Sequence, residues 1–488
     1  MTYRDIGAEE YRAATALDLA REVTDGTLSP VALAELALGL AAEAEPVINA
    51  YAFFRREAAL REASALEAEA TAGHARSVLH GVPVAVKDNS YLAGEATSHG
   101  SRTASAEPAT VSSPFIGRLV RAGAVVIGKT TTPEFGWKGT GISPRTGMTR
   151  NPWDPARGSG GSSSGSGATV ASGAVPIATG SDAGGSIRIP ASWCGVVGLK
   201  PTLSAIPVWP GTANELLSHA GPLTRSVADA RAVLELTRGA DPRDPQSAYP
   251  APLRDAPGAR VRVGVVPGPF GITALSGVDR AFQAAMRALR AALPAAGIAD
   301  LVEAELAMPV PREVFEAMWV TGRGLGYADV IRARAEIMDP GLVRLLGLAQ
   351  EYSLADYYAA MTARRAFSAA VCALFEQVDL LVLPTMPRTA LPAAAEVPPG
   401  GEADAKLPWI TWTPYTYPFN ITGQPAITIP CGFDPDGMPV GLQVVGPWGH
   451  DERVLRFAQA CEQALSGVVT ARVAPRLTSA PHPTPKEG

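Results

Sequence analysis

Short apolar runs alternate with longer segments of helical periodicity along most of the chain. Residues 82–86 are apolar throughout and are followed by Lys87, which predicts a buried strand with a lysine at its end. The same pattern predicts a helix over residues 113–122 and further buried strands at 124–127, 175–178 and 195–199. Because buried strands that alternate with helices are typical of layered folds, the chain is predicted to have α/β architecture.

The remaining segments are mostly helical, with a hairpin near the end of the chain. Residues 11–72 have helical patterns, one of which begins at Ser29 and Pro30, a capping residue followed by a proline at the first helical position. Later elements are predicted to be a mostly helical stretch at 277–377, a hairpin at 428–432 and 439–445, and a last helix at 451–465. The predicted organisation is a helical cover in 1–75, an α/β core in 76–465 with a mostly helical insertion at 265–380, and a Pro-rich tail in 466–488.

Composition and charge exclude several classes of protein. Hydrophobic residues make up 47% of the 488 and charged residues 18%, which predicts a globular chain with a large core. A net charge of −5 gives no basic footprint for nucleic acid, and no apolar run approaches the roughly 18 residues that a membrane-spanning helix needs. The first residues lack the apolar segment of a signal peptide and the four cysteines match no disulfide or metal spacing, so a reduced, cytoplasmic setting is expected.

Two Gly/Ser clusters, residues 160–163 and 184–186, lie within the stretch from Gly158 to Pro201. Glycine lets the backbone approach a ligand closely, and rows of backbone N–H groups can bind an anion or an oxyanion. A flexible linker is the alternative, but the segment between the clusters has the helix and strand patterns of a packed domain. A Walker-type phosphate loop is not indicated, because neither cluster is followed by Gly-Lys-Ser/Thr.

No histidine lies in this stretch, so acyl transfer there needs another base. A Ser–Lys pair is a known variant of the catalytic triad, and a buried lysine loses affinity for its proton because burial disfavours the charged form. Lys87 is therefore a candidate base. The alternative is a structural lysine whose stem packs in the core while its ammonium reaches water or a carboxylate.

Further motifs surround the two clusters, and Ser186 follows Ser162 by 24 residues. The motifs are Gly81-Val82-Pro83, Lys87-Asp88, Gly128-Lys129-Thr130, Gly160-Gly161-Ser162-Ser163, Gly180-Ser181-Asp182, Gly184-Gly185-Ser186-Ile187-Arg188, Gly198-Leu199-Lys200-Pro201-Thr202 and Gly221-Pro222-Leu223-Thr224. In these motifs and in the serine separation the sequence resembles the amidase signature family of Ser–Ser–Lys hydrolases, over roughly residues 10–465. The resemblance implies a single large α/β/α sandwich around a mixed β-sheet, with a helical cap or insertion.

The resemblance also implies a role for each residue of a site. Ser186 would be the nucleophile that forms an acyl-enzyme, Ser162, in a cis peptide, would relay protons, and Lys87 would be the base. The oxyanion hole would consist of the N–H groups of Ala183, Gly184, Gly185 and Ser186. The supporting residues would be Ser163, Asp182 and Arg188, with a purely structural ion pair as the alternative for Arg188. No cofactor and no metal are implied, and the six histidines have no ligand spacing.

Substrate-binding residues follow from the same resemblance. Gly136 and Trp137 occupy the position of a loop that lines the acyl pocket in the family, and the alternative for Trp137 is a tryptophan of the core. The segment 265–420 is expected to shape the leaving-group channel, and the candidate lining is aromatic: Trp412, Tyr415, Tyr417 and Phe419. Aromatic lining suits aryl amides or aryl carbamates. His99 follows the lysine segment and is expected to have a hydrogen-bonded structural role, with an approach to the site as the alternative.

Three functions are compatible with the resemblance. The first, which we expect, is a cytoplasmic amidase that hydrolyses small or aryl amides, or carbamates (urethanes), as a monomer or homodimer without nucleic-acid or membrane partners. The second is the glutaminase (A-type) subunit of a tRNA-dependent amidotransferase, which works in a complex; residues 202–207 depart from the Tyr-Gly-Arg-Val-like run of such subunits. The third, a binding scaffold without activity, is disfavoured because Lys87, Ser162 and Ser186 are all present.

Overall fold

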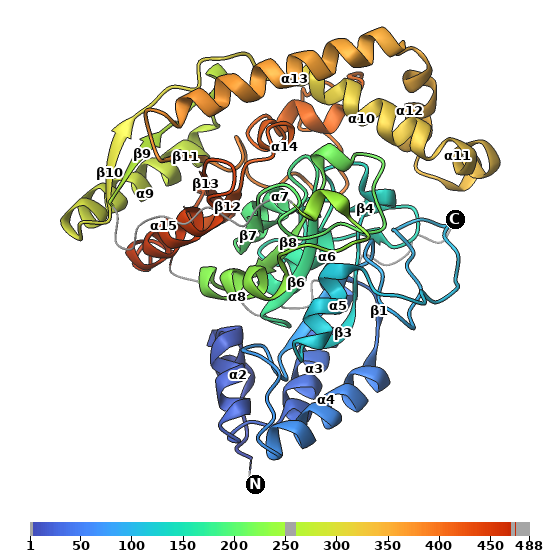
Figure 1. The fold of residues 1–488 in the computed structure, drawn as a ribbon, viewed down its shortest axis with the longest axis vertical. Coiled ribbons are helices and arrows are strands. Elements are labelled where there is room, and N and C mark those ends of the chain that lie inside the picture. The colour runs from blue at the N-terminus through green and yellow to red at the C-terminus, as the bar shows by residue number, and fades with distance from the viewer. Residues whose placement is uncertain (1–2, 249–259, 470–473, 475–488) are drawn as a thin grey trace.

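A mixed sheet of 11 strands forms the centre of the computed structural model, which describes residues 3–248, 260–469 and 474 (Figure 1). The strands are β1 (Tyr51–Phe54), β2 (Pro83–Lys87), β3 (Val125–Thr130), β6 (Ile177–Asp182), β7 (Val197–Lys200), β8 (His219–Thr224), β9 (Val261–Val265), β10 (Ala299–Glu303), β11 (Leu380–Pro384), β12 (Ala426–Phe433) and β13 (Pro439–Val445). Their order in the sheet is β1-β3-β2-β6-β8-β7-β12-β13-β11-β9-β10. Four neighbouring pairs, β3–β2, β2–β6, β11–β9 and β9–β10, are parallel, and the other pairs are antiparallel. The predicted α/β fold with a mixed sheet is confirmed.

Helices surround this sheet, and several begin where the sequence places a cap. They are α1 (Ala8–Ala13), α2 (Ala16–Thr24), α3 (Pro30–Ile48), α4 (Arg56–Thr71), α5 (Pro114–Arg121), α6 (Ser164–Ala171), α7 (Arg188–Cys194), α8 (Val227–Thr237), α9 (Ser276–Ala295), α10 (Arg312–Gly326), α11 (Ala328–Arg334), α12 (Pro340–Gln350), α13 (Leu354–Leu374), α14 (Pro418–Ile421) and α15 (Asp451–Ala464). Ser29 Oγ accepts a hydrogen bond from the N–H of Ala32 at 3.1 Å, with Pro30 at the first helical position. Such a cap satisfies one of the N–H groups that a helix start leaves without a partner.

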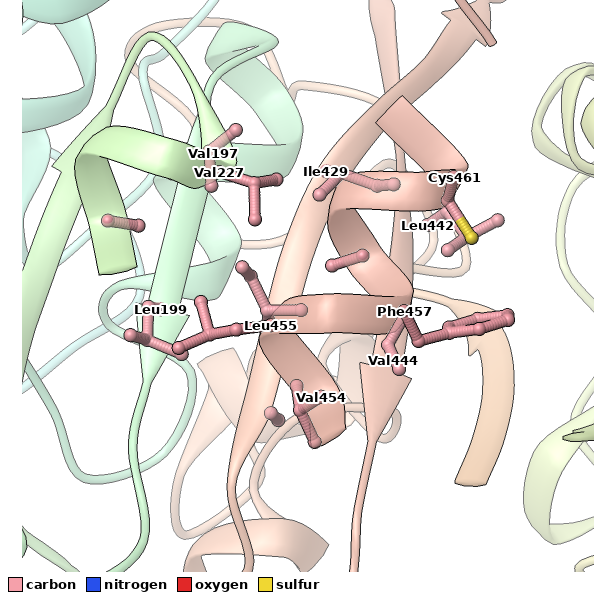
Figure 2. Close-up of a cluster of buried hydrophobic side chains, with 14 of the residues drawn as sticks. Val197, Leu199, Val227, Ile429, Leu442, Val444, Val454, Leu455, Phe457 and Cys461 are labelled. Carbon is pink, nitrogen blue, oxygen red and sulfur yellow. The ribbon is translucent and has the colours of Figure 1, made fainter. Parts of the chain in front are cut away.

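The alternation of side chains along each strand divides the core into layers. On β2, Val84 and Val86 belong to the apolar cluster that includes residues of α5, α8, α9 and α15, whereas Ala85 belongs to the cluster that includes residues of α3, α4, α6 and α7. Because successive side chains of a strand point to opposite faces, these two clusters lie on opposite faces of the sheet. Figure 2 shows the first cluster, where Leu455 and Val454 of α15 pack beside side chains of β7, β12 and β13.

Two strands of the 11-stranded sheet, β8 and β10, were not predicted from the sequence. β8 contains Gly221 and Pro222, which weaken a strand pattern, and yet it pairs with both β6 and β7. β10 lies at the edge of the sheet beside β9, within the insertion that was predicted to be mostly helical. The N-terminal segment also does more than cover the core, because β1 pairs with β3 and forms the other edge of the sheet.

The helices α10, α12 and α13 form a cap at the top of Figure 1, and α2, α3 and α4 lie at the bottom. Helix α10 packs against both α12 and α13. Of the predicted tail at 466–488, only residues 466–469 and 474 are among those described. No helix within the described residues is both long and apolar enough to cross a lipid bilayer.

Candidate active site

Lys87 lies at the carboxyl end of β2, which is parallel to its neighbour β6. Carboxyl ends of parallel strands meet at one edge of a sheet, so the end of β6, with Ser181 and Asp182, lies close to Lys87. The side chain of Lys87 is fully buried, and Nζ donates hydrogen bonds to Ser162 Oγ at 2.8 Å and to Ser181 Oγ at 3.0 Å. Within the described part of the chain, no carboxylate forms an ion pair with it.

The protonation of Lys87 follows from these surroundings. Burial lowers the pKa of its ammonium well below the ordinary value of 10.5. The charge of Asp182 opposes this change in pKa, and the positive charge of Arg323 adds to it. An amine whose pKa is lowered in this way can accept a proton at neutral pH.

Ser162 lies in the turn that precedes α6, and the peptide bond between Gly161 and Ser162 is cis, as predicted. The turn is packed closely against residue 136. Gly136 has a φ of +63°, and a Cβ added there would lie 3.1 Å from Ser162 Oγ. Glycine at 136 therefore leaves the room that the Ser162 hydroxyl occupies beside Lys87.

Ser186 lies just before α7, and its side chain is buried except for 5% of its surface. The carbonyl of Ser186 accepts a hydrogen bond from the N–H of Ser163 at 3.1 Å, which joins the two Gly/Ser clusters. Ser162 and Ser186 line the same pocket, although no hydrogen bond joins their two hydroxyls in the described chain. Hydrogen bonds of catalytic groups are often longer in unliganded structures than in complexes.

The backbone around residues 183–186 was predicted to provide four N–H donors for an oxyanion. The N–H of Gly185 already donates to Asp182 Oδ1 at 2.7 Å. The prediction for this N–H is therefore wrong in this structure, and the donors that remain are those of Ala183, Gly184 and Ser186. A Cβ added at Gly184 would lie 2.7 Å from Trp409, so the close packing of this loop requires glycine.

Asp182 and Arg188 hold this loop in place. Arg188 donates to both carboxylate oxygens of Asp182, at 2.9 and 3.0 Å, and further donors to Asp182 include the N–H of Ile187 at 3.1 Å and Asn420 Nδ2 at 2.8 Å. Burial alone would raise the pKa of Asp182, but the charge and hydrogen bonds of Arg188 outweigh this effect and keep the pKa below its ordinary value. The buried ion pair thus fixes the loop that begins at Ala183.

Ser163, the third predicted supporting residue, links the turn of the first cluster to β6. Its Oγ donates to the carbonyl of Ser181 at 3.3 Å, and its side chain is fully buried. Ser163 therefore contacts the strand from which Ser181 reaches Lys87, and it makes no contact with Lys87 itself among the hydrogen bonds of the described residues.

The pocket above the two serines has a volume of about 270 Å³. Its aromatic and imidazole lining consists of Tyr91, His99, Phe115, Phe135, Trp209, His219, Trp319 and Tyr327. Three of these rings form a continuous stack, with centroids 5.7 Å apart for His99 and Phe135 and 4.4 Å apart for Phe135 and Tyr327. Burial lowers the pKa of His99 to about 4, so its imidazole is neutral at pH 7. His99 thus lines the pocket, which was the alternative to the structural role expected from the sequence.

The aromatic residues predicted to line the channel lie elsewhere. Among the described residues that line the pocket there is no member of the predicted set, Trp412, Tyr415, Tyr417 and Phe419. Each of these side chains is buried in an apolar cluster. Trp137 is also a core residue, because its ring packs against Gly341, while Gly136 lines the pocket as predicted.

Comparison with known proteins places the chain in a family. A family model described as Amidase matches residues 32–455, which is most of the chain. The chain belongs to the amidase signature family. A solved structure of a bacterial aryl acylamidase from this family superposes on the amidase with a TM-score of 0.82 and 25% identity, over 92% of this chain and 96% of that one.

Two curated relatives of this amidase have names that describe different functions. The A-type subunit of the glutamyl-tRNA(Gln) amidotransferase of Synechococcus sp. (strain RCC307) is 34% identical over 478 residues, which cover 90% of this chain and 95% of that protein. The acylamidase of Rhodococcus erythropolis is also 34% identical, over 457 residues that cover 91% of this chain and 94% of that protein. Family membership supports amide hydrolysis, and it does not choose between these two kinds of amidase.

Two residues of the amidase site were missed from the sequence. Ser181 contacts Lys87 Nζ, and its place in the motif Gly180-Ser181-Asp182 at the end of a predicted strand was a usable indication. Arg323 lines the pocket from α10, far along the chain in the variable insertion, and no local pattern distinguishes it from other arginines there. Only the packing of the cap onto the core brings it to the serines.

Proposed function

We propose that this amidase hydrolyses small amides, with aryl amides as the foremost class, through an acyl-enzyme on Ser186. Ser186 Oγ attacks the carbonyl carbon while its proton passes through Ser162 Oγ to Lys87 Nζ. The N–H groups of Ala183, Gly184 and Ser186 bind the carbonyl oxygen as it becomes an oxyanion, an interaction worth several kcal/mol in such sites. The C–N bond then breaks, and the amine leaves with a proton from Ser162.

The second half of the reaction repeats the same proton path with water as the nucleophile. A water molecule attacks the acyl-enzyme, and its proton passes through Ser162 to Lys87 as before. The ester bond to Ser186 breaks, and Ser186 Oγ regains a proton while the carboxylic acid leaves. The observation that supports this proposal most is the buried Lys87 with hydroxyl partners and no carboxylate partner in the described chain.

The aryl preference rests on the pocket lining. Flat aromatic substrates pack well against aromatic rings, and the stack of His99, Phe135 and Tyr327 offers such a wall. Aryl carbamates fit the same wall, because they react at a carbonyl of similar shape. A comparison of rates on 4-nitroacetanilide and ethyl N-(4-nitrophenyl)carbamate, which both release 4-nitroaniline when the C–N bond breaks, separates the two classes.

The test of the mechanism uses a chromogenic anilide and the variant Ser186→Ala. We expect kcat/KM to fall by about 10⁴-fold or more, as when a triad nucleophile is removed. Mass spectrometry of the quenched wild-type enzyme should find the acyl group on the peptide that contains Ser186. The control is Ser172→Ala, whose hydroxyl donates to the Thr169 carbonyl within the core and should leave turnover in place. Turnover by Ser186→Ala near the wild-type rate would refute the mechanism.

A second candidate is the glutaminase subunit of a tRNA-dependent amidotransferase, because the Synechococcus relative is such a subunit by name. The two candidates differ in their need for a partner. Purified protein that releases aniline from an anilide without any other chain supports the stand-alone hydrolase. Activity found only with glutamine and a co-expressed partner supports the glutaminase.

A further inference from the structure

Arg323 of α10 places a positive charge in the pocket of the two serines. The residue is buried, with 7% of its surface exposed, and its guanidinium lies over the ring of Trp319 with 4.9 Å between Cζ and the ring centroid. Nη1 donates to the carbonyl of Phe135 at 2.8 Å and to the hydroxyl of Tyr327 at 3.0 Å. These contacts fix the orientation of the guanidinium and use only part of its donors.

The remaining donors of Arg323 have no partner within the described residues. Nε is buried without a hydrogen bond, Nη2 makes none to the protein, and no carboxylate forms an ion pair with the guanidinium. Arg188 provides the contrast, because it donates to Asp182, Asn420 and Gln443. Burial of a charge without an opposite charge is costly, so such a group is expected to gain strongly from an anionic ligand.

Asp182, the other charged residue that lines the pocket, does not neutralise the charge of Arg323. Among the described residues that line the pocket, the side chains with a permanent charge are Arg323 and Asp182. The carboxylate of Asp182 already accepts hydrogen bonds from the side chains of Arg188 and Asn420 and from three backbone N–H groups. The charge that remains available to a substrate in the pocket is therefore positive.

We propose that the guanidinium of Arg323 binds a carboxylate of the substrate, so that the enzyme prefers acidic amides to their neutral counterparts. This proposal rests on the proposed amide hydrolysis and names the class of substrate for it. The planar guanidinium matches a carboxylate in shape and donor geometry, which an ammonium does not. The carboxylate belongs either to the acyl part or to the amine part of the substrate, and the experiment distinguishes these two positions.

The test compares two pairs of substrates that differ in charge and little in size. For the acyl part, the pair is glutaryl 4-nitroanilide and pentanoyl 4-nitroanilide. For the amine part, the pair is N-acetyl-4-aminobenzoate and N-acetyl-4-methylaniline. We expect the wild-type enzyme to prefer the acidic member of one pair by about 10–100-fold in kcat/KM, the range of a charge-assisted hydrogen bond.

Two variants of Arg323 and one control complete this experiment. Arg323→Met should reduce the preference to about one, and Arg323→Lys should keep part of it, because the charge remains while the planar fork is lost. The control is Arg332→Met on α11, where an exposed arginine pairs with Asp329 and the preference should persist. Hydrolysis of both members of each pair by the wild-type enzyme at equal kcat/KM would overturn the proposal. An equal loss of activity on both members of a pair in Arg323→Met, with the preference retained, would also overturn it and assign Arg323 a structural role.

A binding measurement separates this proposal from the proposed function. In the Ser186→Ala background, calorimetry should find tighter binding of glutaramate than of pentanamide, or of 4-acetamidobenzoate than of N-acetyl-4-methylaniline. Adding Arg323→Met should remove the difference. If the wild-type enzyme hydrolyses none of the substrates and this difference in binding persists, the proposed hydrolysis fails and the carboxylate site stands. Equal binding of acidic and neutral amides would refute the carboxylate site whatever the activity.

Discussion

Two buried lysines at the ends of adjacent strands have opposite kinds of partner. Lys87 of β2 and Lys129 of β3 are both fully buried, and Val86 and Lys129 are paired in the register of the two parallel strands. Lys129 Nζ lies 2.8 Å from Asp88 Oδ1 and donates to Thr97 Oγ1 at 2.7 Å. Lys87 Nζ contacts two serine hydroxyls instead.

This difference decides what each lysine can do. Burial lowers the pKa of both side chains, but for Lys129 the charge and hydrogen bond of Asp88 act against burial. A carboxylate partner favours the cation, whereas hydroxyl partners accept or donate and tolerate a neutral amine. Burial alone therefore does not allow a lysine to act as a base. Its hydrogen-bond partners decide whether it can do so.

Lys200 extends the comparison to a third case. It is fully buried, burial lowers its pKa well below the ordinary value, and its Nζ lies 3.2 Å from His219 Nε2. In the described chain its hydrogen-bond partners are His219 and the carbonyl of Gln424, and no serine is among them. A neutral lysine thus has no role in acyl transfer unless it also contacts the hydroxyl that passes on the proton.

Turnover should distinguish the two lysines most strongly. We expect Lys87→Met to lower kcat/KM on an anilide by about 10⁴-fold, because methionine cannot accept the proton from Ser162. Lys129→Met should lower it by less than about 10-fold when assayed at a temperature where the variant is folded. Circular dichroism checks the fold of both variants. Comparable losses in the two variants would mean that burial of a lysine near the site matters and the hydroxyl partners do not.

The next effect is on stability, and its sign is opposite for the two lysines. The folded protein holds Lys87 with a pKa below that of the unfolded chain, so at neutral pH the unfolded chain binds the additional proton and unfolding is favoured. This penalty disappears only as the pH rises above the ordinary value for lysine. Lys87→Met should therefore increase the free energy of unfolding at pH 7, by about 1–3 kcal/mol.

Lys129→Met should instead decrease the free energy of unfolding, by about 3–5 kcal/mol, because Asp88 would remain buried without its cation. Urea titrations measure both variants. The matched control is the double variant Asp88→Asn with Lys129→Met, which removes both charges and should recover part of the loss. If Lys129→Met stabilised the protein, the ion pair with Asp88 would not offset the free-energy cost of burying the two charges.

Local sequence patterns were sufficient to predict the strand and the turns at the end of the sheet where Lys87 lies. The apolar run before Lys87 predicts β2, and the Gly/Ser clusters predict two turns where ordinary side chains do not fit. These features are local, because a buried strand requires a short run of apolar residues and a turn without room for a Cβ requires glycine. The pairing of β2 with β6 then brings Lys87 and Ser181 together at one edge.

The walls of the pocket were not predictable in the same way. Tyr415 and Phe419 belong to the core, while Trp319 and Tyr327 line the pocket, and both pairs are aromatic residues within 265–420. An aromatic side chain looks the same in the sequence whether its ring faces a core or a cavity. The decision depends on how the cap helix α10 packs onto the sheet, which involves contacts between distant parts of the chain. The engaged N–H of Gly185 was missed for a different reason: its partner Asp182 is only three residues away, but the sequence does not show which way that carboxylate points.

The pH dependence of kcat/KM should change less than turnover or stability does. Lys87 acts as a base only when neutral, so kcat/KM should fall as the pH drops through its pKa in the free enzyme. The positive charge of Arg323 lowers the pKa of Lys87, so Arg323→Met should move the midpoint of this fall to higher pH. Pentanoyl 4-nitroanilide is the substrate of choice, because it has no carboxylate whose binding would change in the same variant.

The two buried lysines differ again in this measurement. Lys129 is not among the charges that shift the pKa of Lys87, so Lys129→Met should leave the midpoint where the wild-type enzyme has it. Solvent and ionic strength are kept constant across the three profiles, since screening alters the interaction between Arg323 and Lys87. A midpoint that moves with Lys129→Met and stays fixed with Arg323→Met would assign the pH dependence to the Asp88–Lys129 pair. The base would then have to be sought there, at the end of β3, and not at Lys87.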